Sequence, residues 1–287
     1  MKDRTVLITG CSSGFGRALV PVLLGRHWTV IASLRNAEAR TGLFSQELKI
    51  HPHSLHVISL DVTNEQEREK AFEFARDRFH RLDVLINNAG HGLFGALEDV
   101  SETQLRQQME ANFFGTAFMT RTFLPLLRQA RGKILNISSV MGSFGMPLSS
   151  GYCSSKFALE GLSECLYYEL KPFGVQVCLV EPGRHRTDFS RNMVWGEKSQ
   201  DSRSLYTRLT EAFDRRRERL GKRVVPQENV VRVIVKLCET PRVPLRVPVG
   251  KDALLAQLIQ TLLPQRLRTA LLWGYYEWTL RKNLQKS

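Results

Sequence analysis

The chain has 287 residues, 43% hydrophobic and 24% charged, which is ordinary for a soluble globular protein and excludes a mostly disordered or collagen-like chain. Its net charge is +13, and most of the excess lies in residues 203–287, where 18 Lys and Arg face 7 Asp and Glu. Five cysteines with no paired C-x-x-C spacing argue against a disulfide framework and for a reducing compartment.

Short apolar runs alternate with longer helical patterns along most of the chain. The predicted strands are 4–8, 29–33, 55–60, 84–86, 133–137 and 175–180, and the predicted helices are 15–26, 65–80, 102–130 and 153–171. The strands are nearly continuous in apolar residues, as expected for parallel strands buried on both faces. We therefore predict a Rossmann-like α/β fold in a single domain, with a doubly wound parallel sheet of about seven strands.

The pattern changes after the sixth strand. Residues 187–223 are polar and Arg-rich, with a helical tendency over 204–219, and we expect this insertion to form a lid. A helix over 226–239 and a strand over 245–249 then complete the sheet. We expect residues 1–250 to form the catalytic domain and residues 251–287 to form a basic, amphipathic helical extension packed on it, broken at Pro264.

A glycine-rich turn follows the first predicted strand directly, in the order strand, turn, helix. It reads Thr-Gly-Cys-Ser-Ser-Gly-Phe-Gly over residues 9–16. Glycines let a diphosphate approach the backbone, and the following helix offers free amides and a positive dipole. The second strand is followed by Arg35 rather than by the carboxylate that an NAD site favours, so we expect NADP, with NAD less favoured. A solvated Arg35 is the alternative.

Two further strand ends carry polar residues. Asp61 closes the third strand and either accepts from the adenine amine or caps the helix that starts near residue 65. Asn87 and Asn88 close the fourth strand beside two small residues, where they either meet the cofactor ribose or only brace neighbouring strands.

Tyr152 and Lys156 are spaced four residues apart on a predicted helix, so their side chains share a face. An ammonium beside a phenol favours the phenolate, and we expect Lys156 to lower the pKa of Tyr152 from about 10. Such a phenol exchanges a proton with an alcohol near neutral pH. On its own the spacing is weak evidence, because many surface helices carry it.

Together with Ser139, Asn112 and Pro182-Gly183, these motifs resemble the ordered set of the short-chain dehydrogenase/reductase superfamily over about residues 3–250. The likeness is strongest to hydroxysteroid and retinol dehydrogenase-like members. It implies that Tyr152 is the general acid or base, that Lys156 supports it and holds the nicotinamide ribose, that Ser139 binds the substrate oxygen, and that Asn112 anchors a relay water. The cofactor-binding residues implied by the likeness and by the motifs are Gly10, Ser12, Ser13, Gly14, Phe15, Gly16, Arg35, Asp61, Val62, Asn88, Ala89, Gly90, Tyr152, Lys156, Pro182, Gly183 and Thr187.

Arg184 and His185 depart from the resemblance, since these positions are usually small or apolar. With Arg186 they form a basic run that either contacts an anionic group on substrate or cofactor or points to solvent at the lid hinge. The solvent-facing interpretation is favoured.

The predicted substrate wall is apolar and suggests a steroid, retinoid or long-chain carbonyl. Its residues are Leu93, Phe94, Phe144, Met146, Leu148, Phe189, Met193, Val194 and Trp195, of which Phe94, Phe144, Met146, Met193 and Trp195 are the candidates for direct contact. The predicted function is NADP-dependent interconversion of a carbonyl and an alcohol, and the alternative is a non-catalytic NADP-binding regulator or scaffold of the same fold.

We expect no metal site, no nucleic-acid partner and a homodimer or homotetramer. The first apolar run begins at Thr5, so we expect no signal peptide, and no apolar run approaches the about 18 residues of a membrane span. The expected location is cytoplasmic. The aromatic and basic tail leaves three roles open: peripheral membrane contact, a cover over the cleft, or a subunit contact.

Overall fold

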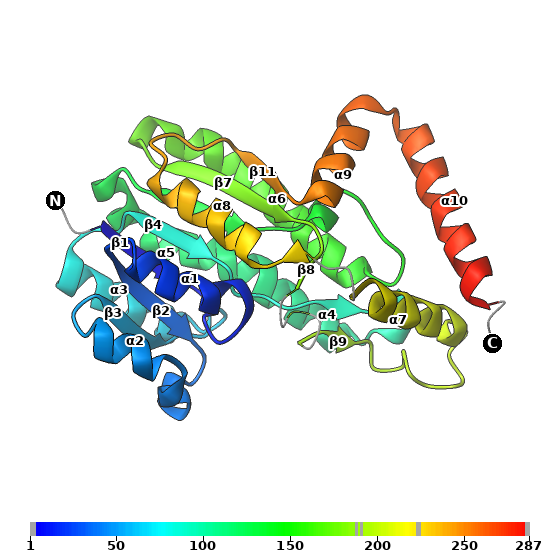
Figure 1. The fold of residues 1–287 in the computed structure, drawn as a ribbon, viewed down its shortest axis with the longest axis horizontal. Helices are drawn as coiled ribbons and strands as arrows, with labels where there is room; N and C mark the ends of the chain where they lie inside the picture. Colours follow the sequence, from blue (N-terminus) through cyan, green and yellow to red (C-terminus); the bar gives the residue numbers. More distant parts are fainter. Residues whose placement is uncertain (1–3, 187–188, 190–191, 222–224, 285–287) are drawn as a thin grey trace.

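A parallel sheet lies at the centre of the structure, a computed structural model that describes residues 4–186, 189, 192–221 and 225–284 (Figure 1). Its seven strands follow the order β11-β7-β6-β4-β1-β2-β3. They are β1 (Arg4–Ile8), β2 (Trp28–Leu34), β3 (Leu55–Ser59), β4 (Val84–Asn87), β6 (Lys133–Ile137), β7 (Gln176–Pro182) and β11 (Arg246–Val249). The predicted doubly wound sheet of about seven strands is confirmed.

Helices cover both faces of the sheet because alternate strand residues point to opposite sides. Val6 and Ile8 of β1 belong to the core under one helical layer, whereas Leu7 belongs to the core under the other. The first layer contains α1 (Gly14–Leu24) and α8 (Glu228–Glu239), and the second contains α3 (Glu65–Phe79), α5 (Gly115–Ala130) and α6 (Ser150–Leu170). Both faces of β1 are therefore buried, which explains its continuous apolar sequence.

The strand order reverses at β1, which pairs with β2 on one side and with β4 on the other. In open α/β sheets, ligands bind beyond the carboxyl ends of the strands at such a switch point. The glycine-rich turn follows β1 directly. The topology therefore places residues 9–16 and the end of β4 at one crevice.

The helix predicted over 102–130 is interrupted in the structure. It consists of α4 (Glu102–Met109), a π turn over Glu110–Phe114 and α5. The helical segment Ala37–Phe44 and α2 (Ser45–Ile50) were not predicted. Three short 3-10 turns lie at Leu97–Asp99, Val140–Gly142 and Lys171–Phe173.

The insertion after β7 adds α7 (Thr207–Gly221) and short strands that tie it to the main body. β9 (Val194–Trp195) pairs with β5 (Leu93–Phe94), and β10 (Val225–Pro226) pairs with β8 (His185–Arg186). The expected helical lid is therefore present, held by two small parallel ladders.

Two helices form the tail, α9 (Lys251–Leu262) and α10 (Gln265–Leu284), and the break lies at Pro264 as predicted. Figure 1 shows α10 extending past the sheet toward the lid helix α7. Tyr275 of α10 accepts a hydrogen bond from Arg216 of α7. The division of the chain at residue 250 stays a prediction. Within the ranges that the structure describes, no helix is long and apolar enough to cross a membrane.

Candidate active site

A cavity of about 2100 Å³ opens at the carboxyl ends of the central strands. Typical sites for one small ligand measure roughly 300–1,000 Å³, so this one has room for a dinucleotide and a second molecule. It is lined by most of the predicted cofactor residues: Gly10, Ser12, Ser13, Gly14, Phe15, Arg35, Asp61, Val62, Asn88, Ala89, Gly90, Tyr152, Lys156, Pro182 and Gly183. Thr187 lies outside the described residues.

The glycine turn is shaped for close approach of a ligand backbone. Gly10 and Gly14 have φ of 71° and 55°, which side chains rarely tolerate. Gly16 lies behind the turn, and a Cβ there would come within 2.5 Å of the Gly10 carbonyl oxygen. The turn and the first residues of α1 line the cavity, so the positive end of this helix faces it. This cradle fits the diphosphate of a dinucleotide.

The amides after β4 hold the turn in place. Asn88 Nδ2 donates to the carbonyl oxygens of Thr9 at 2.8 Å and Gly10 at 3.1 Å. Thr9 Oγ1 accepts from the backbone N–H groups of Asn88 and Ala89, both at 2.9 Å. Asn87 donates to Thr120 and to Asn136, deeper in the sheet. Bracing of neighbouring segments, one of the two predicted roles, is therefore seen for both asparagines.

Near the glycine turn, the cavity is also lined by Arg35, which follows β2, and by Arg40, which sequence reasoning missed although it lies only five residues further on. Both are exposed at the rim. Asp61 Oδ1 accepts from the backbone N–H and the hydroxyl of Thr63 at 2.9 and 2.8 Å. The cap of α3 is Asn64, which accepts from the Glu67 N–H. The predicted capping role of Asp61 is therefore wrong, because Asn64 occupies that position.

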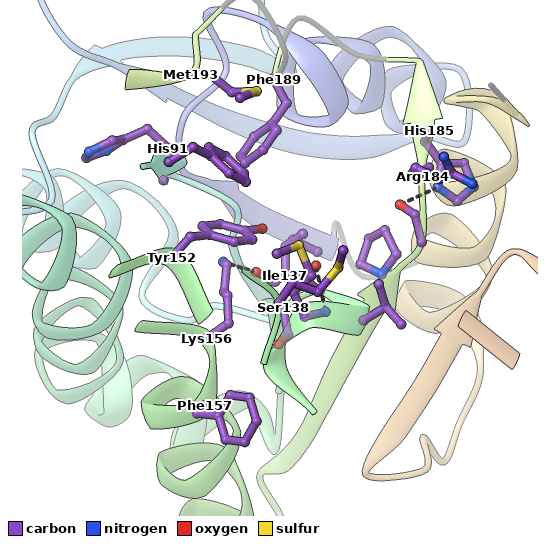
Figure 2. Close-up of a pocket in the computed structure, with 18 of the residues that line it drawn as sticks. His91, Ile137, Ser138, Tyr152, Lys156, Phe157, Arg184, His185, Phe189 and Met193 are labelled. Carbon is purple, nitrogen blue, oxygen red and sulfur yellow. Dashed lines mark hydrogen bonds between the residues drawn. The ribbon is translucent and has the colours of Figure 1, made fainter. Parts of the chain in front are cut away.

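Tyr152 and Lys156 lie one turn apart on α6, and both side chains are buried (Figure 2). Lys156 Nζ donates to the Ile137 carbonyl oxygen at 2.8 Å and lies 5.9 Å from the Tyr152 ring centroid. Ser139 lies two residues after the end of β6, and its hydroxyl accepts from the Met141 N–H at 3.1 Å. Strand β6 and helix α6 thus bring the three predicted side chains to the cavity wall.

Burial governs the protonation of this pair in the chain alone. Desolvation raises the pKa of Tyr152 to about 12, against a smaller lowering by the Ser139 hydrogen bond. Desolvation lowers the pKa of Lys156 to about 8, against the charge of Glu160. The expected lowering of the Tyr152 pKa by Lys156 is therefore not seen in the chain alone, because burial outweighs the distant ammonium. At neutral pH the phenol holds its proton and is a potential donor.

Asn112 lies in the π turn and is buried. Its Oδ1 accepts from the His91 N–H, and its Nδ2 donates to the His91 carbonyl oxygen and to Ser155 Oγ, each at 3.0 Å. It therefore fastens the segment after β4 to α6, one residue before Lys156. The relay water that the resemblance implies stays a prediction.

Asn112 also draws attention to His91, a cavity residue that sequence reasoning missed. Burial lowers the pKa of His91, and the charges of Arg35 and Lys156 act in the same direction. A neutral imidazole therefore faces the cavity. A lone histidine in a loop gives little signal in the sequence.

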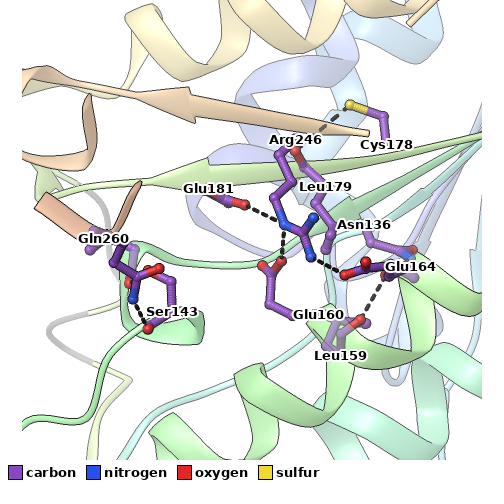
Figure 3. A network of polar contacts seen from close by, with 12 residues as sticks. Asn136, Ser143, Leu159, Glu160, Glu164, Cys178, Leu179, Glu181, Arg246 and Gln260 are labelled. Atoms are coloured by element: carbon purple, nitrogen blue, oxygen red, sulfur yellow. Dashed lines mark hydrogen bonds and ion pairs between the residues drawn. The ribbon is translucent and has the colours of Figure 1, made fainter. Parts of the chain in front are cut away.

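Behind Lys156, three carboxylates share one arginine (Figure 3). Arg246 contacts Glu160 at 3.1 Å, Glu164 at 2.8 Å and Glu181 at 3.6 Å. Desolvation, followed by the charge of Glu160, raises the pKa of Glu181 to about 7. Desolvation likewise raises the pKa of Glu160. The network couples β7, β11 and α6 beneath the lysine.

Aromatic rings surround Tyr152 on the cavity side. Phe94 stacks on Tyr152 with ring centroids 5.7 Å apart, and Phe189 lies 5.5 Å away. Phe213 of α7, which was not predicted, packs against Phe94 at 5.9 Å. Of the five direct-contact candidates, Phe94, Phe144, Met146 and Met193 line the cavity. The prediction for Trp195 is wrong: it does not line this cavity, and it packs edge-on against Phe213, which does.

The basic run at the lid hinge divides in two. Arg184 is exposed, its N–H donates to Asp252 Oδ2 at 2.7 Å, and its guanidinium lies 4.0 Å from the same carboxylate. The solvent-facing position favoured for His185 is wrong. Its ring packs edge-on against Phe15, and its Nε2 is buried with no hydrogen-bond partner. The apolar contact with Phe15 explains the difference.

The tail helices also reach the cavity. The lining residues of α9 and α10 are Asp252, Leu255, Ala256, Ile259, Gln260, Gln265, Arg268, Thr269, Leu272, Trp273, Tyr275 and Tyr276. Their spacing of three and four residues is that of one helical face. Of the three predicted roles of the tail, a wall of the cleft is the one that the structure shows.

Comparison with known proteins gives a consistent family. Residues 4–198 match the family model described as short chain dehydrogenase. The chain is 37% identical over 294 aligned residues to the uncharacterized oxidoreductase YusZ of Bacillus subtilis, covering 99% of each chain. It is 41% identical to a 3-ketodihydrosphingosine reductase of Bacteroides thetaiotaomicron over 67% of this chain and 68% of that protein.

Solved structures agree. A short-chain dehydrogenase from Streptomyces avermitilis superposes with a TM-score of 0.79 at 31% identity, covering 97% of this chain and 99% of that one. The structure of ElxO with NADP bound superposes with a TM-score of 0.67 at 26% identity, covering 86% of this chain and 97% of that one.

Proposed function

The chain belongs to the short-chain dehydrogenase family of oxidoreductases, and from this premise we propose that it is an NADPH-dependent reductase of lipophilic carbonyl compounds. One observation carries the proposal. The same cavity joins the glycine turn after β1, the Tyr152 and Lys156 pair, and an aromatic wall. A cofactor cradle and a proton donor thus open onto one apolar space.

NADP is the proposed cofactor because of the charge at the crevice rim. Arg35 and Arg40 line the end of the cavity next to the glycine turn, where a 2′-phosphate would find two guanidinium groups. The similarity to ElxO, whose structure holds NADP, supports the same choice. When bound, the reduced cofactor supplies the hydride.

The residues of this chain supply the proton and the orientation. The Tyr152 phenol, protonated at neutral pH because of burial, donates its proton to the carbonyl oxygen as negative charge develops there. The Ser139 hydroxyl holds the same oxygen by a hydrogen bond. Lys156, kept in place by the Ile137 carbonyl, stabilises the resulting phenolate until a proton is restored. Phe94, Phe189 and Phe213 limit access of water.

A lipophilic substrate is proposed from the composition of the wall. Apolar and aromatic side chains from β5, the lid and both tail helices surround the cavity in front of Tyr152. Such a site binds chiefly by burying apolar surface, with few polar groups that set orientation. A steroid, a retinoid and a long-chain carbonyl all meet this description.

The test is an assay of NADPH absorbance with ketosteroids, retinals, long-chain aldehydes and small ketones, with NADH as the control cofactor. We expect oxidation of NADPH with at least one lipophilic carbonyl, faster than with small ketones. A chain that binds NADPH but oxidises it with none of these compounds would support the regulator alternative instead.

Two further proposals concern partners. We propose a homodimer or homotetramer, and light scattering after size-exclusion chromatography measures its mass; a monomer at micromolar concentration contradicts it.

We also propose that the outer face of the tail touches anionic membrane surfaces. Leu254, Leu258, Leu267, Leu271 and Trp278 are exposed there, with Lys251 and Arg266 close in sequence. Co-sedimentation with anionic vesicles at low salt tests this contact. A protein that stays out of the vesicle pellet contradicts it.

A further inference from the structure

The end of the cavity between α7 and α10 carries charges that the proposed reduction does not use. Four arginines line this region: Arg184, Arg216, Arg217 and Arg268. Among the described residues, the acidic side chains that line the whole cavity are Asp61, Glu110 and Asp252. Asp61 lies after β3 and Glu110 in the π turn, and both line the cofactor end with Val62. Asp252 is thus the acid on the wall near these arginines.

The available carboxylates are already engaged. Asp252 accepts from the Arg184 N–H at 2.7 Å and lies 4.0 Å from its guanidinium. Asp214 pairs with Arg217 at 2.7 Å. Within the described part of the chain, no carboxylate forms an ion pair with Arg216 or Arg268. These two guanidinium groups therefore leave a positive excess on the cavity wall.

Arg216 is held rather than free to turn into solvent. Its guanidinium lies 4.6 Å from the ring centroid of Tyr275 and donates a hydrogen bond to the Tyr275 hydroxyl. Desolvation lowers its pKa, and the charge of Arg184 acts in the same direction. A fixed, partly desolvated guanidinium beside a second one is unfavourable in the free protein and is relieved by a bound anion.

Arg268 points to the same space from α10. Its Nε is buried and has no hydrogen-bond partner. Leu272 and Tyr275, four and seven residues further on, lie on the same face and line the cavity with it. A buried donor without a partner is costly, so this guanidinium is incompletely satisfied in the free protein.

An apolar stretch separates these arginines from the phenol. Phe213 precedes Arg216 by one turn of α7, a rise of about 5 Å. Phe213 packs on Phe94 at 5.9 Å, and Phe94 stacks on Tyr152 at 5.7 Å. A molecule that reached from Tyr152 to Arg216 would therefore present a carbonyl, then an apolar segment, then a charged end.

We propose that Arg216 and Arg268 bind an anionic oxygen group, such as a carboxylate, at the far end of an amphiphilic carbonyl substrate; the reacting end of this assignment rests on the proposed reductase function. The planar fork of a guanidinium matches a carboxylate, and two of them on facing helices fix its position. The same charges repel a substrate that ends in an ammonium group.

Binding of non-reacting probes tests the site without turnover. Octanoate, octan-1-ol and octylamine share one chain length, and each is titrated by calorimetry into the full chain saturated with NADPH. The bound cofactor keeps its phosphates from competing, and in its reduced form it cannot oxidise octan-1-ol. We expect octanoate to bind at least tenfold more tightly than octan-1-ol, and octylamine to bind more weakly than either. Equal affinity for octanoate and octan-1-ol overturns the proposal.

Substitutions of the two arginines test which side chains bind the anionic group. Arg216→Gln and Arg268→Gln are each expected to reduce the octanoate preference at least tenfold while leaving octan-1-ol unchanged. Arg215→Gln, exposed on the neighbouring position of α7, is the matched control and keeps the preference. Arg268→Gln breaks no ion pair in the described structure, so it remains decisive if Arg216→Gln fails to fold. A preference that survives in Arg268→Gln overturns the assignment. Because no probe carries an aldehyde or ketone, this result is independent of whether the reductase proposal holds.

Discussion

The ammonium nitrogen of Lys156 lies 5.9 Å from the ring centroid of Tyr152, while it donates a hydrogen bond to the Ile137 carbonyl oxygen at 2.8 Å. The lysine is therefore anchored to the end of β6 and not to the phenol. In the chain alone, burial keeps Tyr152 protonated and makes Lys156 the group that titrates in an accessible range. This relationship suits a proton donor and leads to the first prediction.

The rate of carbonyl reduction should fall as the pH rises through about 8. Below that value Lys156 is charged and stabilises the phenolate; above it the ammonium loses its proton, because burial lowers its pKa to about 8. Tyr152, with a pKa of about 12, stays protonated across the same range. The measurement is kcat from about pH 6 to about pH 10 at saturating NADPH, and a rate that is constant up to pH 10 contradicts the assignment.

Replacing Arg35 should change the choice between cofactors. Arg35→Gln removes one of two guanidinium groups at the rim, so we expect KM for NADPH to rise about tenfold while KM for NADH stays unchanged. Arg78→Gln, an exposed change on α3 away from the cavity, is the control. An unchanged KM for NADPH in Arg35→Gln would assign Arg35 to the solvated rim.

A methyl group at position 16 should weaken cofactor binding. The Cβ of Gly16→Ala would lie 2.5 Å from the Gly10 carbonyl oxygen and 2.6 Å from Asn88 Nδ2, so the turn must open. We expect the affinity for NADP⁺ to fall at least tenfold, measured by calorimetry.

The matched control for that change is Gly161→Ala in the middle of α6, where a Cβ meets nothing within 4 Å. It should keep the affinity and add up to about 1 kcal/mol of stability. Unchanged affinity in Gly16→Ala would mean that the turn is not the diphosphate site.

Glu181→Gln should stabilise the fold at about pH 8. Burial and the charge of Glu160 raise the pKa of Glu181 from 4.5 to about 7, so the folded chain binds the extra proton and loses stability as the pH rises from about 4.5 through about 7. Glutamine removes this loss. We expect the melting temperature at pH 8 to exceed that of the parent chain by about 3 °C, and the two to converge at pH 5.

Glu164→Gln is the comparison for that experiment, since Glu164 is half exposed and pairs with the same Arg246. This change should either lower the melting temperature at pH 8 or leave it unchanged. A Glu181→Gln variant that is less stable than the parent at pH 8 would contradict the claim that the ionised Glu181 carboxylate destabilises the fold.

Local sequence signals account for most of the fold. The strands Arg4–Ile8 and Lys133–Ile137 have the predicted bounds because their apolar runs are short and flanked by polar residues. The π turn at Glu110–Phe114 was missed, because a widened turn leaves the helical apolar period nearly intact. The helix over Ser45–Ile50 was missed because it is short and buries none of its side chains fully.

The parts of the site that are built from residues close together in the sequence were predicted well. The parts that combine distant residues were predicted less well. Tyr152 and Lys156 share one helix, and the glycine turn is continuous. Trp195 was placed on the wall because apolar character does not tell a lining residue from the layer behind it. Arg216 and Arg268 are 52 positions apart by their numbers, and only the packing of α7 beside α10 brings both to the cavity.

The most direct test of the account is the turnover of Tyr152→Phe with NADPH and whichever lipophilic carbonyl is the fastest substrate in the assay. The change removes one hydroxyl and keeps the ring that stacks on Phe94. We predict that kcat falls about a hundredfold or more while the affinity for NADPH is retained. A variant that reduces the same carbonyl at the full rate would contradict the assignment of Tyr152 as the proton donor.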